Sequence, residues 1–424
     1  MTGIKPDSKY LDWLANLDSR IVAASRDIKV LSRLSWPADV QSSFLTQVAA
    51  GNLVMPEPVY AAVDLSANRA ELADCMVQLA NSDEPLRRFL FDTADSYHTL
   101  CLLLEGIGTP TLCTHSKTLY GSPTDAVSSG HVNNLEAAKH FLEVCQSYKQ
   151  VGTLQEVDYC LSPEIMAKEM RQRLNEVFEE GVVRVEIDDD MVSKAAAGAT
   201  RVRLRANTSF TEYDLDQLLQ HEAFVHSLTA INGKQQRFQC FSLGAPRTTG
   251  AQEGLATFAE MVTGVMDIGR LERLALRVVG INNVLEGADF IEAYRFFLNV
   301  GQSEVESFNS AMRIFRGVPV TGGSAFTKDV VYLHGLMEVH TFFRWAMQHK
   351  KLHISQHFFA GRMTLSDVLR LEPVFETNIL AGAKYLPPWM KRTSALAGYL
   401  AFSVFMNRVF VESMGEDFTF VRTD

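Results

Sequence analysis

Apolar residues recur every three to four positions along most of this 424-residue chain, and the spacing changes only in one central stretch. The helical spacing covers Tyr10–Leu31 and Pro85–Glu105, and it returns from Gly250 to about Phe410. In the centre, Val182–Ile187 (VVRVEI) and Thr200–Ala206 (TRVRLRA) alternate apolar and polar residues as strands do. We therefore expect a predominantly helical α+β fold in which these two strands pair as a small sheet.

A helix is predicted directly after the second strand. Thr211-Glu212-Tyr213-Asp214 resembles a capping box, which is a typical helix start. Leucines at helical spacing continue the segment, and Asn232-Gly233 is a typical helix end. By contrast, Lys117–Pro123 (KTLYGSP) has the composition of a loop.

No Pro/Gly/Ser-rich linker and no internal repeat divides the chain, and 47% of its residues are hydrophobic, which is enough for a large core. We expect a helical region, residues 1–95, packed on a larger unit, residues 96–424, as one compact body. The six cysteines show no C-x-x-C spacing and are interpreted as buried, reduced thiols of a cytoplasmic protein. Met1–Asp18 carries acids and a helical pattern, which disfavours a secretory signal.

The formal net charge of −10 disfavours nucleic acids and anionic membranes as partners, because both are themselves negatively charged. No stretch reaches the ~20 apolar residues that a bilayer-spanning helix needs. The longest candidate, Ala395–Met406, is interrupted by Gly398 and Ser403, so we expect a buried helix there. The sequence indicates no oligomeric state.

The most informative motif is His221-Glu222-Ala223-Phe224-Val225-His226. It is one residue longer than H-E-x-x-H, in which two histidines of one helix hold zinc and the glutamate acts as general base. In a regular helix, residues four apart lie about 40° apart, but residues five apart lie about 140° apart. The two histidines therefore share a metal only if the helix is locally overwide around Ala223–Val225, as in a π-bulge. The alternative is an accidental pair of partly buried histidines.

A third ligand candidate opens the next helix. In Gln252-Glu253-Gly254-Leu255-Ala256, Glu253 lies near the positive end of the predicted helix. Two histidines and one glutamate, with an open position for water, are a typical catalytic zinc set. Glu260 follows about two turns later on the same face, and it is either a reserve ligand or a hydrogen-bond partner for an imidazole. An ordinary exposed acid is the commoner interpretation of such a residue.

The two segments together carry a family resemblance. LLQHEAFVHSLTAINGKQ followed by AQEGLATFAEMVTG resembles the flavohemoglobin expression-modulating QEGLA-motif proteins, a family of unknown function that also includes the microtubule-associated tyrosine carboxypeptidase. The similarity extends from Lys117–Gly121 through the strand region to Arg316-Gly317 and Phe326–Tyr332, and so covers most of the chain.

The resemblance implies a zincin-like metallopeptidase core, with the sheet beside the metal-binding helix. It implies that one zinc ion is held by His221, His226 and Glu253, and that Glu222 is the catalytic base. The expected activity is that of a carboxypeptidase, similar to a tyrosine carboxypeptidase, which removes the C-terminal residue of a peptide or protein by Glu222-assisted attack of zinc-bound water. The chain has no long basic extension that would dock on a microtubule, so the activity class is carried over without the substrate.

A carboxypeptidase also needs cations that bind the terminal carboxylate of its substrate. The candidates are Arg313 and Arg316 in AMRIFRGV, and Lys328 with Tyr332 in FTKDVVY. Lys328 and Tyr332 are four residues apart and would share one helix face, where Tyr332 could donate a hydrogen bond to the oxyanion. A salt bridge for Lys328 and half-buried packing for Tyr332 are the alternatives.

Two further clusters allow a second interpretation. Arg201, Arg203 and Arg205 share one face of a predicted strand, which indicates a solvated face or, less commonly, an edge strand that pairs with an acidic peptide. His334 follows Tyr332 closely and could support the site.

Two alternative functions remain open at this level. The first is a regulatory or peptide-binding protein whose metal site is not catalytic. The second is a zinc amidohydrolase that acts on a small molecule.

Overall fold

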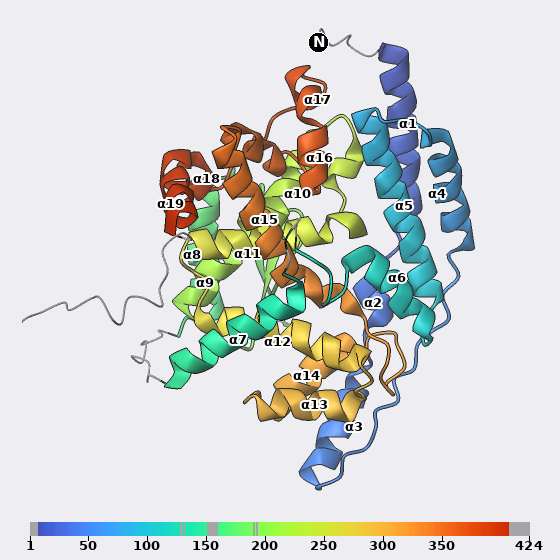
Figure 1. The fold of residues 1–424 in the computed structure, drawn as a ribbon, viewed down its shortest axis with the longest axis vertical. Coiled ribbons are helices and arrows are strands. Elements are labelled where there is room, and N and C mark those ends of the chain that lie inside the picture. The colour runs from blue at the N-terminus through green and yellow to red at the C-terminus, as the bar shows by residue number, and fades with distance from the viewer. Residues whose placement is uncertain are drawn as a thin grey trace, which may run out of the picture.

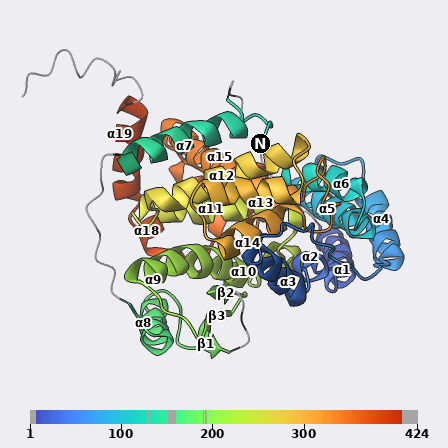
Figure 2. The ribbon, with the colours of Figure 1, turned by 90° about the horizontal axis from the view of Figure 1, so that it is seen from below.

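The computed structural model describes residues 7–127, 130, 132–150, 160–189, 191 and 194–406. This part of the chain is predominantly helical and contains one three-stranded sheet (Figures 1 and 2), which confirms the expected α+β class. One apolar core extends from Leu11 near the N-terminus to Leu400 near the end of the described chain. The elements that carry the predicted site therefore rest on a shared core.

The N-terminal helices form one flank of the molecule, on which α1, α4 and α5 lie side by side (Figure 1). This flank is joined to the centre by Asp18, whose carboxylate accepts the backbone N–H groups of Gln239 at 2.6 Å and Cys240 at 2.9 Å. Burial raises the pKa of Asp18 in spite of these bonds. The helices of this part are α1 (Ser8–Ser25), α2 (Val30–Leu34), α3 (Ala38–Ala49), α4 (Ser66–Leu79), α5 (Pro85–Glu105) and α6 (Pro110–Tyr120).

The predicted loop at Lys117–Pro123 is only partly correct. Helix α6 continues to Tyr120, and the chain leaves it at Gly121, which has a positive φ of 84°. Leu112, Cys113, Ser116 and Tyr120 form a buried face of α6. The tertiary packing of this face outweighs the loop-like composition of the segment.

The sheet confirms the pairing of the two predicted strands and adds a third strand. β1 (Arg184–Asp188) and β3 (Arg201–Arg205) are parallel neighbours, and β2 (Ala195–Ala197) pairs antiparallel on the other side of β3. The alternating pattern did not reveal β2, because its three alanines carry no such pattern. The sheet lies beside α8 (Pro163–Asn175) and below the central helices (Figure 2).

The order of the strands overturns the edge-strand interpretation of the arginines. β3 is the central strand, so its backbone is paired on both sides and cannot take up a peptide. On its outer face, Arg201 pairs with Glu186 and Arg203 with Asp188. The arginines therefore belong to a solvated face of cross-strand ion pairs, each worth little energetically.

The centre of the molecule consists of two helical segments that follow the sheet. The first is continuous and comprises α9 (Glu212–Leu218), the wide helix η1 (Leu219–Ser227) and α10 (Leu228–Gly233), so the predicted end at Gly233 is confirmed. Its start is also confirmed, because Thr211 and Asp214 form a reciprocal capping box. Two short 3₁₀ turns, η2 (Gln239–Ser242) and η3 (Pro246–Thr248), lead to α11 (Thr249–Val262).

The remaining elements enclose this centre, with α7, α12 and α15 on one side (Figure 2). The helical prediction beyond Gly250 is confirmed as far as Met406, the last described residue. These elements are α7 (Asn134–Gln150), α12 (Ile268–Leu285), α13 (Phe290–Asn299), α14 (Glu304–Ile314), η4 (Thr327–Val330), α15 (Val331–Gln348), η5 (Leu352–Phe359), α16 (Leu365–Arg370), α17 (Glu372–Glu376), α18 (Pro388–Lys391) and α19 (Thr393–Met406).

Two glycines allow α11 and α15 to cross at very short range. A Cβ added to Gly254 would lie 2.3 Å from the backbone carbonyl of Gly335, and one added to Gly335 would lie 2.3 Å from the carbonyl oxygen of Gly250. No side chain fits between the two backbones at this point. The glycine of the QEGLA segment therefore has a packing reason, and the crossing fixes the position of Glu253 beside it.

Two expectations about burial need correction. Helix α19 is not buried all round: Leu396 and Leu400 face the core, but Phe402 and Phe405 are more than half exposed. Five cysteines are buried as expected, whereas Cys160 is exposed, and none forms a disulfide within the described chain. Within the described ranges, no helix is both long enough and apolar enough to cross a membrane.

Candidate metal centre

The helix that carries both histidines is wide over nine residues. Leu219–Ser227 forms a π-helix, in which residues five apart are joined by hydrogen bonds and lie one above the other. This confirms the expected widening and extends it beyond Ala223–Val225. The histidine rings accordingly lie close together, with centroids 4.9 Å apart and an interplanar angle of 83°.

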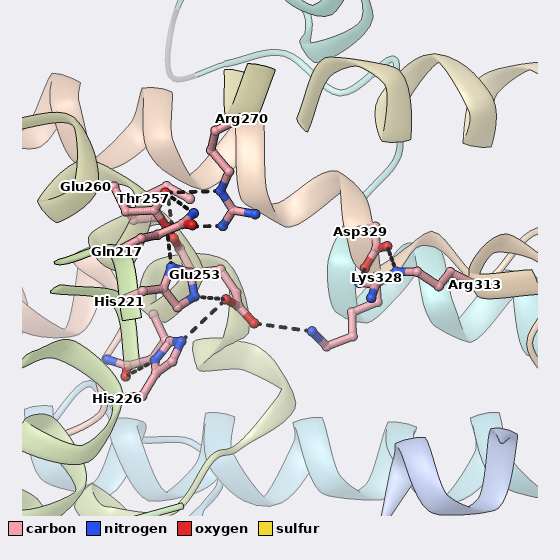
Figure 3. Close-up of polar contacts among 12 residues, drawn as sticks. Gln217, His221, His226, Glu253, Thr257, Glu260, Arg270, Arg313, Lys328 and Asp329 are labelled. Atoms are coloured by element: carbon pink, nitrogen blue, oxygen red, sulfur yellow. Dashed lines mark hydrogen bonds and ion pairs between the residues drawn. The ribbon is translucent and has the colours of Figure 1, made fainter. Parts of the chain in front are cut away.

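Glu253 completes a three-residue cluster with these histidines (Figure 3). Its Oε2 lies 3.3 Å from His221 Nε2 and 3.5 Å from His226 Nε2. Two ligands bound tetrahedrally to one zinc at the usual bond lengths are separated by about 3.3 Å. The cluster could therefore hold a metal ion with little movement of the side chains.

Glu260 fixes the orientation of His221. Its carboxylate, on α11, is fully buried and lies 2.6 Å from His221 Nδ1. It also accepts two hydrogen bonds from Arg270 of α12, at 3.0 and 3.1 Å, and one from Gln217 at 3.0 Å. The exposed-acid interpretation of Glu260 is thus wrong, and its alternative role as a hydrogen-bond partner of an imidazole agrees with the geometry.

Gln252 supports the second histidine in a similar way. Its Oε1 lies 3.5 Å from His226 Nδ1 and 2.9 Å from the hydroxyl of Thr229. With Nδ1 directed at an acceptor on each ring, both Nε2 atoms are left to face Glu253. Each polar residue of the sequence Gln252-Glu253 therefore contacts the same centre.

The charges around Glu253 make this centre attractive to a cation. Burial opposes the charged form of His221, but its hydrogen bonds to Glu253 and Glu260 outweigh this and raise its pKa to about 10. Burial likewise opposes ionisation of Glu253, whereas Lys328 and the two histidines hold its pKa well below the ordinary value. Two imidazole nitrogens and a carboxylate oxygen meet here, and either protons or a metal ion can neutralise their mutual repulsion. The residues present thus fit a divalent ion.

Glu222 follows His221 directly and lies in the same wide turn. Its side chain is half-buried, and its carboxylate makes no hydrogen bond or ion pair with any described residue. Glu222 is thus a carboxylate without a fixed partner in the described chain, next to a candidate ligand.

Lys328 of η4 and Tyr332 of α15 lie next to each other and close to the three-residue cluster. Lys328 Nζ is 3.4 Å from Oε1 of Glu253 and 5.5 Å from the centre of the Tyr332 ring. Figure 3 shows Glu253 between the histidines on one side and Lys328 on the other. Burial raises the pKa of the Tyr332 hydroxyl, and the nearby Glu253 adds to this effect.

The structure separates the two arginines predicted near the site. Arg313 is closed on Asp329 in a bidentate ion pair, with distances of 2.6 and 2.8 Å, so its donors on this side are occupied. Arg316 makes no such pair, and its buried Nε has no hydrogen-bond partner. Burial and the neighbouring Arg313 lower the pKa of Arg316.

Two cationic residues near the site, Arg277 and Arg362, belong to no motif that the sequence reveals. Arg277 of α12 lies 5.0 Å over the Tyr332 ring and 4.0 Å from Asp329, which is already paired with Arg313. It also lines a cavity of about 410 Å³ between α12 and α14, to which none of the three clustered residues contributes. Arg362, far along the chain, donates a 3.1 Å hydrogen bond to the backbone carbonyl of His226. Only the tertiary fold brings these residues to the site.

His334 does not join this centre. Its Nε2 lies 3.9 Å from Glu338, one turn further along α15. None of the polar contacts of the clustered residues involves His334.

A comparison with family models gives a match that covers most of the chain. The family model described as microtubule-associated tyrosine carboxypeptidase matches residues 45–408, which includes every residue of the cluster. A search of curated proteins gives no match.

Proposed function

Because the chain belongs to the microtubule-associated tyrosine carboxypeptidase family, we propose that it is a zinc-dependent carboxypeptidase that releases the C-terminal residue of a peptide or protein. The observation that carries the proposal is the convergence of His221, His226 and Glu253 on one point, with donor atoms all within 4.8 Å of one another. Two histidines and a glutamate are a common ligand set of catalytic zinc in peptidases.

We propose His221, His226 and Glu253 as the three ligands. A bound zinc ion would polarise the scissile carbonyl and make a water molecule acidic near pH 7. Glu260 and Gln252 hold the two imidazoles with their Nε2 lone pairs toward the ion. In a zincin-like core, the small sheet would lie beside this helix, and the contact of Ser227 with the carbonyl of Gly198 next to β2 supports that arrangement.

Glu222 is the proposed general base. It would take a proton from the attacking water and pass it to the amine that leaves. Its position directly after a ligand, and the absence of competing partners among the described residues, support this role. Its removal should slow the reaction by roughly 10² to 10⁴-fold without removing the metal.

Cations next to the ligands would bind the terminal carboxylate of the substrate. Lys328 is the nearest, and its present partner is the carboxylate of Glu253. Tyr332 could donate its hydroxyl to the oxyanion that develops during attack. Arg277 offers a guanidinium without a hydrogen bond to any described residue, so we place it in the carboxylate site in preference to Arg313, whose donors are occupied. Arg316 remains a further candidate.

The size of the family match supports one functional unit. We propose that residues 96–424 form the catalytic part and that residues 1–95 pack on it, since both contribute to the same apolar core.

The decisive experiment combines metal analysis with a panel of peptides that differ in their C-terminal residue. Purified protein should contain about one zinc per chain and release the terminal amino acid of some of the peptides. Glu222→Gln should keep the zinc and lose the activity. A Glu222→Gln protein that hydrolyses at the wild-type rate would disprove the assigned base. Peptide binding without any hydrolysis would favour the regulatory alternative.

A further inference from the structure

Arg362 belongs to no motif, but its side chain contacts the backbone of His226, a proposed metal ligand. It lies just after η5 and is 136 residues away from His226 in the sequence. Its backbone N–H donates to the carbonyl of Phe241 at 2.7 Å, and Gly361 packs so closely on Phe241 that a Cβ there would come within 2.9 Å. Phe241 is itself buried and stacked on Phe89. The start of the Arg362 side chain is therefore rigidly held.

The Arg362 side chain donates a hydrogen bond to a carbonyl at the end of the wide helix, where backbone N–H donors are too few. Where a helix returns from i→i+5 to i→i+4 hydrogen bonding, the carbonyls of the last wide turn outnumber the N–H groups that regular bonding supplies. Two side chains supply donors in this turn: Thr229 bonds to the carbonyl of Val225 at 2.8 Å, and Arg362 bonds to that of His226 at 3.1 Å. Without such donors, a regular α-helical register would be favoured, and the two histidines would diverge.

The charge of Arg362 is placed to act on the same centre. It makes no salt bridge within the described chain, and its Nε is buried without a partner. Burial lowers the pKa of Arg362, while Tyr97, Glu253 and Glu222 act in the opposite direction. Arg362 is thus a half-buried cation, and the acids that act on its charge include the proposed base and the proposed third ligand.

We propose that Arg362 is a positioning residue of the metal centre: it holds the exit of the π-helix through the carbonyl of His226 and thereby keeps His226 and Glu222 in place. It would do so without touching the metal or the substrate. The inference rests on the proposed metal site, but it does not require that the site hydrolyse peptides.

The test uses the full-length protein loaded with cobalt(II), whose visible absorption reports the geometry of the ligands. We would compare Arg362→Met, Arg362→Lys and Arg344→Met with the wild type. Arg344 is a matched control, because it is another half-buried arginine whose Nε has no partner, and it lies on α15 next to His340 rather than at the cluster. Metal affinity would be measured by competition with a chelator, and folding by circular dichroism of the metal-free protein.

Arg362→Met should bind cobalt and zinc roughly 10- to 100-fold more weakly than the wild type, with an altered cobalt spectrum, as is usual when a supporting group of a metal site is lost. Arg362→Lys keeps a cationic donor, so it should recover at least half of the loss on a logarithmic scale, and Arg344→Met should match the wild type.

A wild-type affinity and spectrum in Arg362→Met would overturn the inference while leaving the proposed function intact. The same holds if folded Arg362→Lys is as defective as Arg362→Met. A wild-type protein that binds no metal would instead overturn the proposed function and this inference together. If Arg362→Met does not fold, Arg362→Lys decides the matter: near-wild-type binding supports the role, and a full loss in a folded protein refutes it.

Discussion

The replacement Glu260→Gln is expected to weaken both the fold and the metal centre, by different routes. Glu260 is fully buried and accepts two hydrogen bonds from Arg270, whose side chain is only 15% exposed. The neutral amide would leave that guanidinium buried without its counter-charge. Breaking a buried ion pair in this way costs about 3–5 kcal/mol. The hydrogen bond to His221 Nδ1 would be weakened at the same time.

The pKa of Glu260 in the metal-free protein shows the same preference for the charged form. Burial opposes ionisation, but the hydrogen bond to His221 and the charge of Arg270 lower the pKa from 4.5 to about 2. This difference corresponds to roughly 3 kcal/mol in favour of the folded state. Because the pKa is lowered on folding, the contribution is complete above pH 4.5 and is lost as the pH falls toward 2.

Urea unfolding of the metal-free protein at pH 7 would measure the loss, with Arg270→Met and the double variant completing a mutant cycle. Removing both partners should cost less than the sum of the single changes by about 1–3 kcal/mol, because no unpaired charge then remains. Zinc affinity should fall by roughly 10- to 100-fold in Glu260→Gln. The reasoning is refuted if this variant unfolds within about 0.5 kcal/mol of the wild type, or if its zinc affinity is unchanged.

Three further outcomes follow from the same contacts. Gly254→Ala should destabilise the protein by at least about 1–3 kcal/mol in thermal or urea unfolding, because its Cβ would collide with the backbone of α15. Gly250→Ala in the same helix has open space and should be neutral, so equal stabilities of the two variants would contradict the close crossing. Arg277→Met should raise the KM of a peptide with a free C-terminal carboxylate about tenfold and leave a C-terminally amidated peptide unaffected. Arg313→Met should instead lower stability, because buried Asp329 would lose its bidentate partner and keep, among the described residues, only the ion pair with Arg277, 4.0 Å away. An unchanged preference for the free acid in Arg277→Met would exclude that arginine. Zinc uptake near pH 8 should release about one proton, because the raised pKa keeps metal-free His221 protonated until the pH approaches 10. Titration calorimetry in buffers of different ionisation enthalpy would detect this proton, and zinc uptake without proton release would show that His221 is neutral before the metal binds.

The sequence was sufficient to locate the wide helix and its candidate metal ligands. Two histidines five residues apart can share a metal only in an overwide helix, and Leu219–Ser227 is such a helix. The capping box at Thr211, the helix end at Gly233 and the pairing of two strands also follow from local patterns. Each of these features depends on residues close together in the chain.

Predictions that depended on contacts with distant segments of the chain were less accurate. The spacing of Glu260 allowed a contact with an imidazole, but an exposed acid was the commoner interpretation, because nothing in the local sequence indicates the buried pair with Arg270. The loop at Lys117–Pro123 was wrong for the residues whose buried face packs in the core. The strand β2 has no pattern of its own and forms only because β3 offers it a partner.

The sequence by itself thus determined the candidate ligand types, the five-residue spacing that indicated a wide helix, and the glycine that lets the next helix approach. Only the tertiary structure decided which cations face that centre: Arg313 is occupied by Asp329, whereas Arg277 and Arg362, which no motif marks, lie beside it. The physical reason is the separation along the chain over which each interaction acts. Backbone hydrogen bonding and capping act over a few residues, but burial and charge pairing depend on whichever distant segments the fold brings into contact.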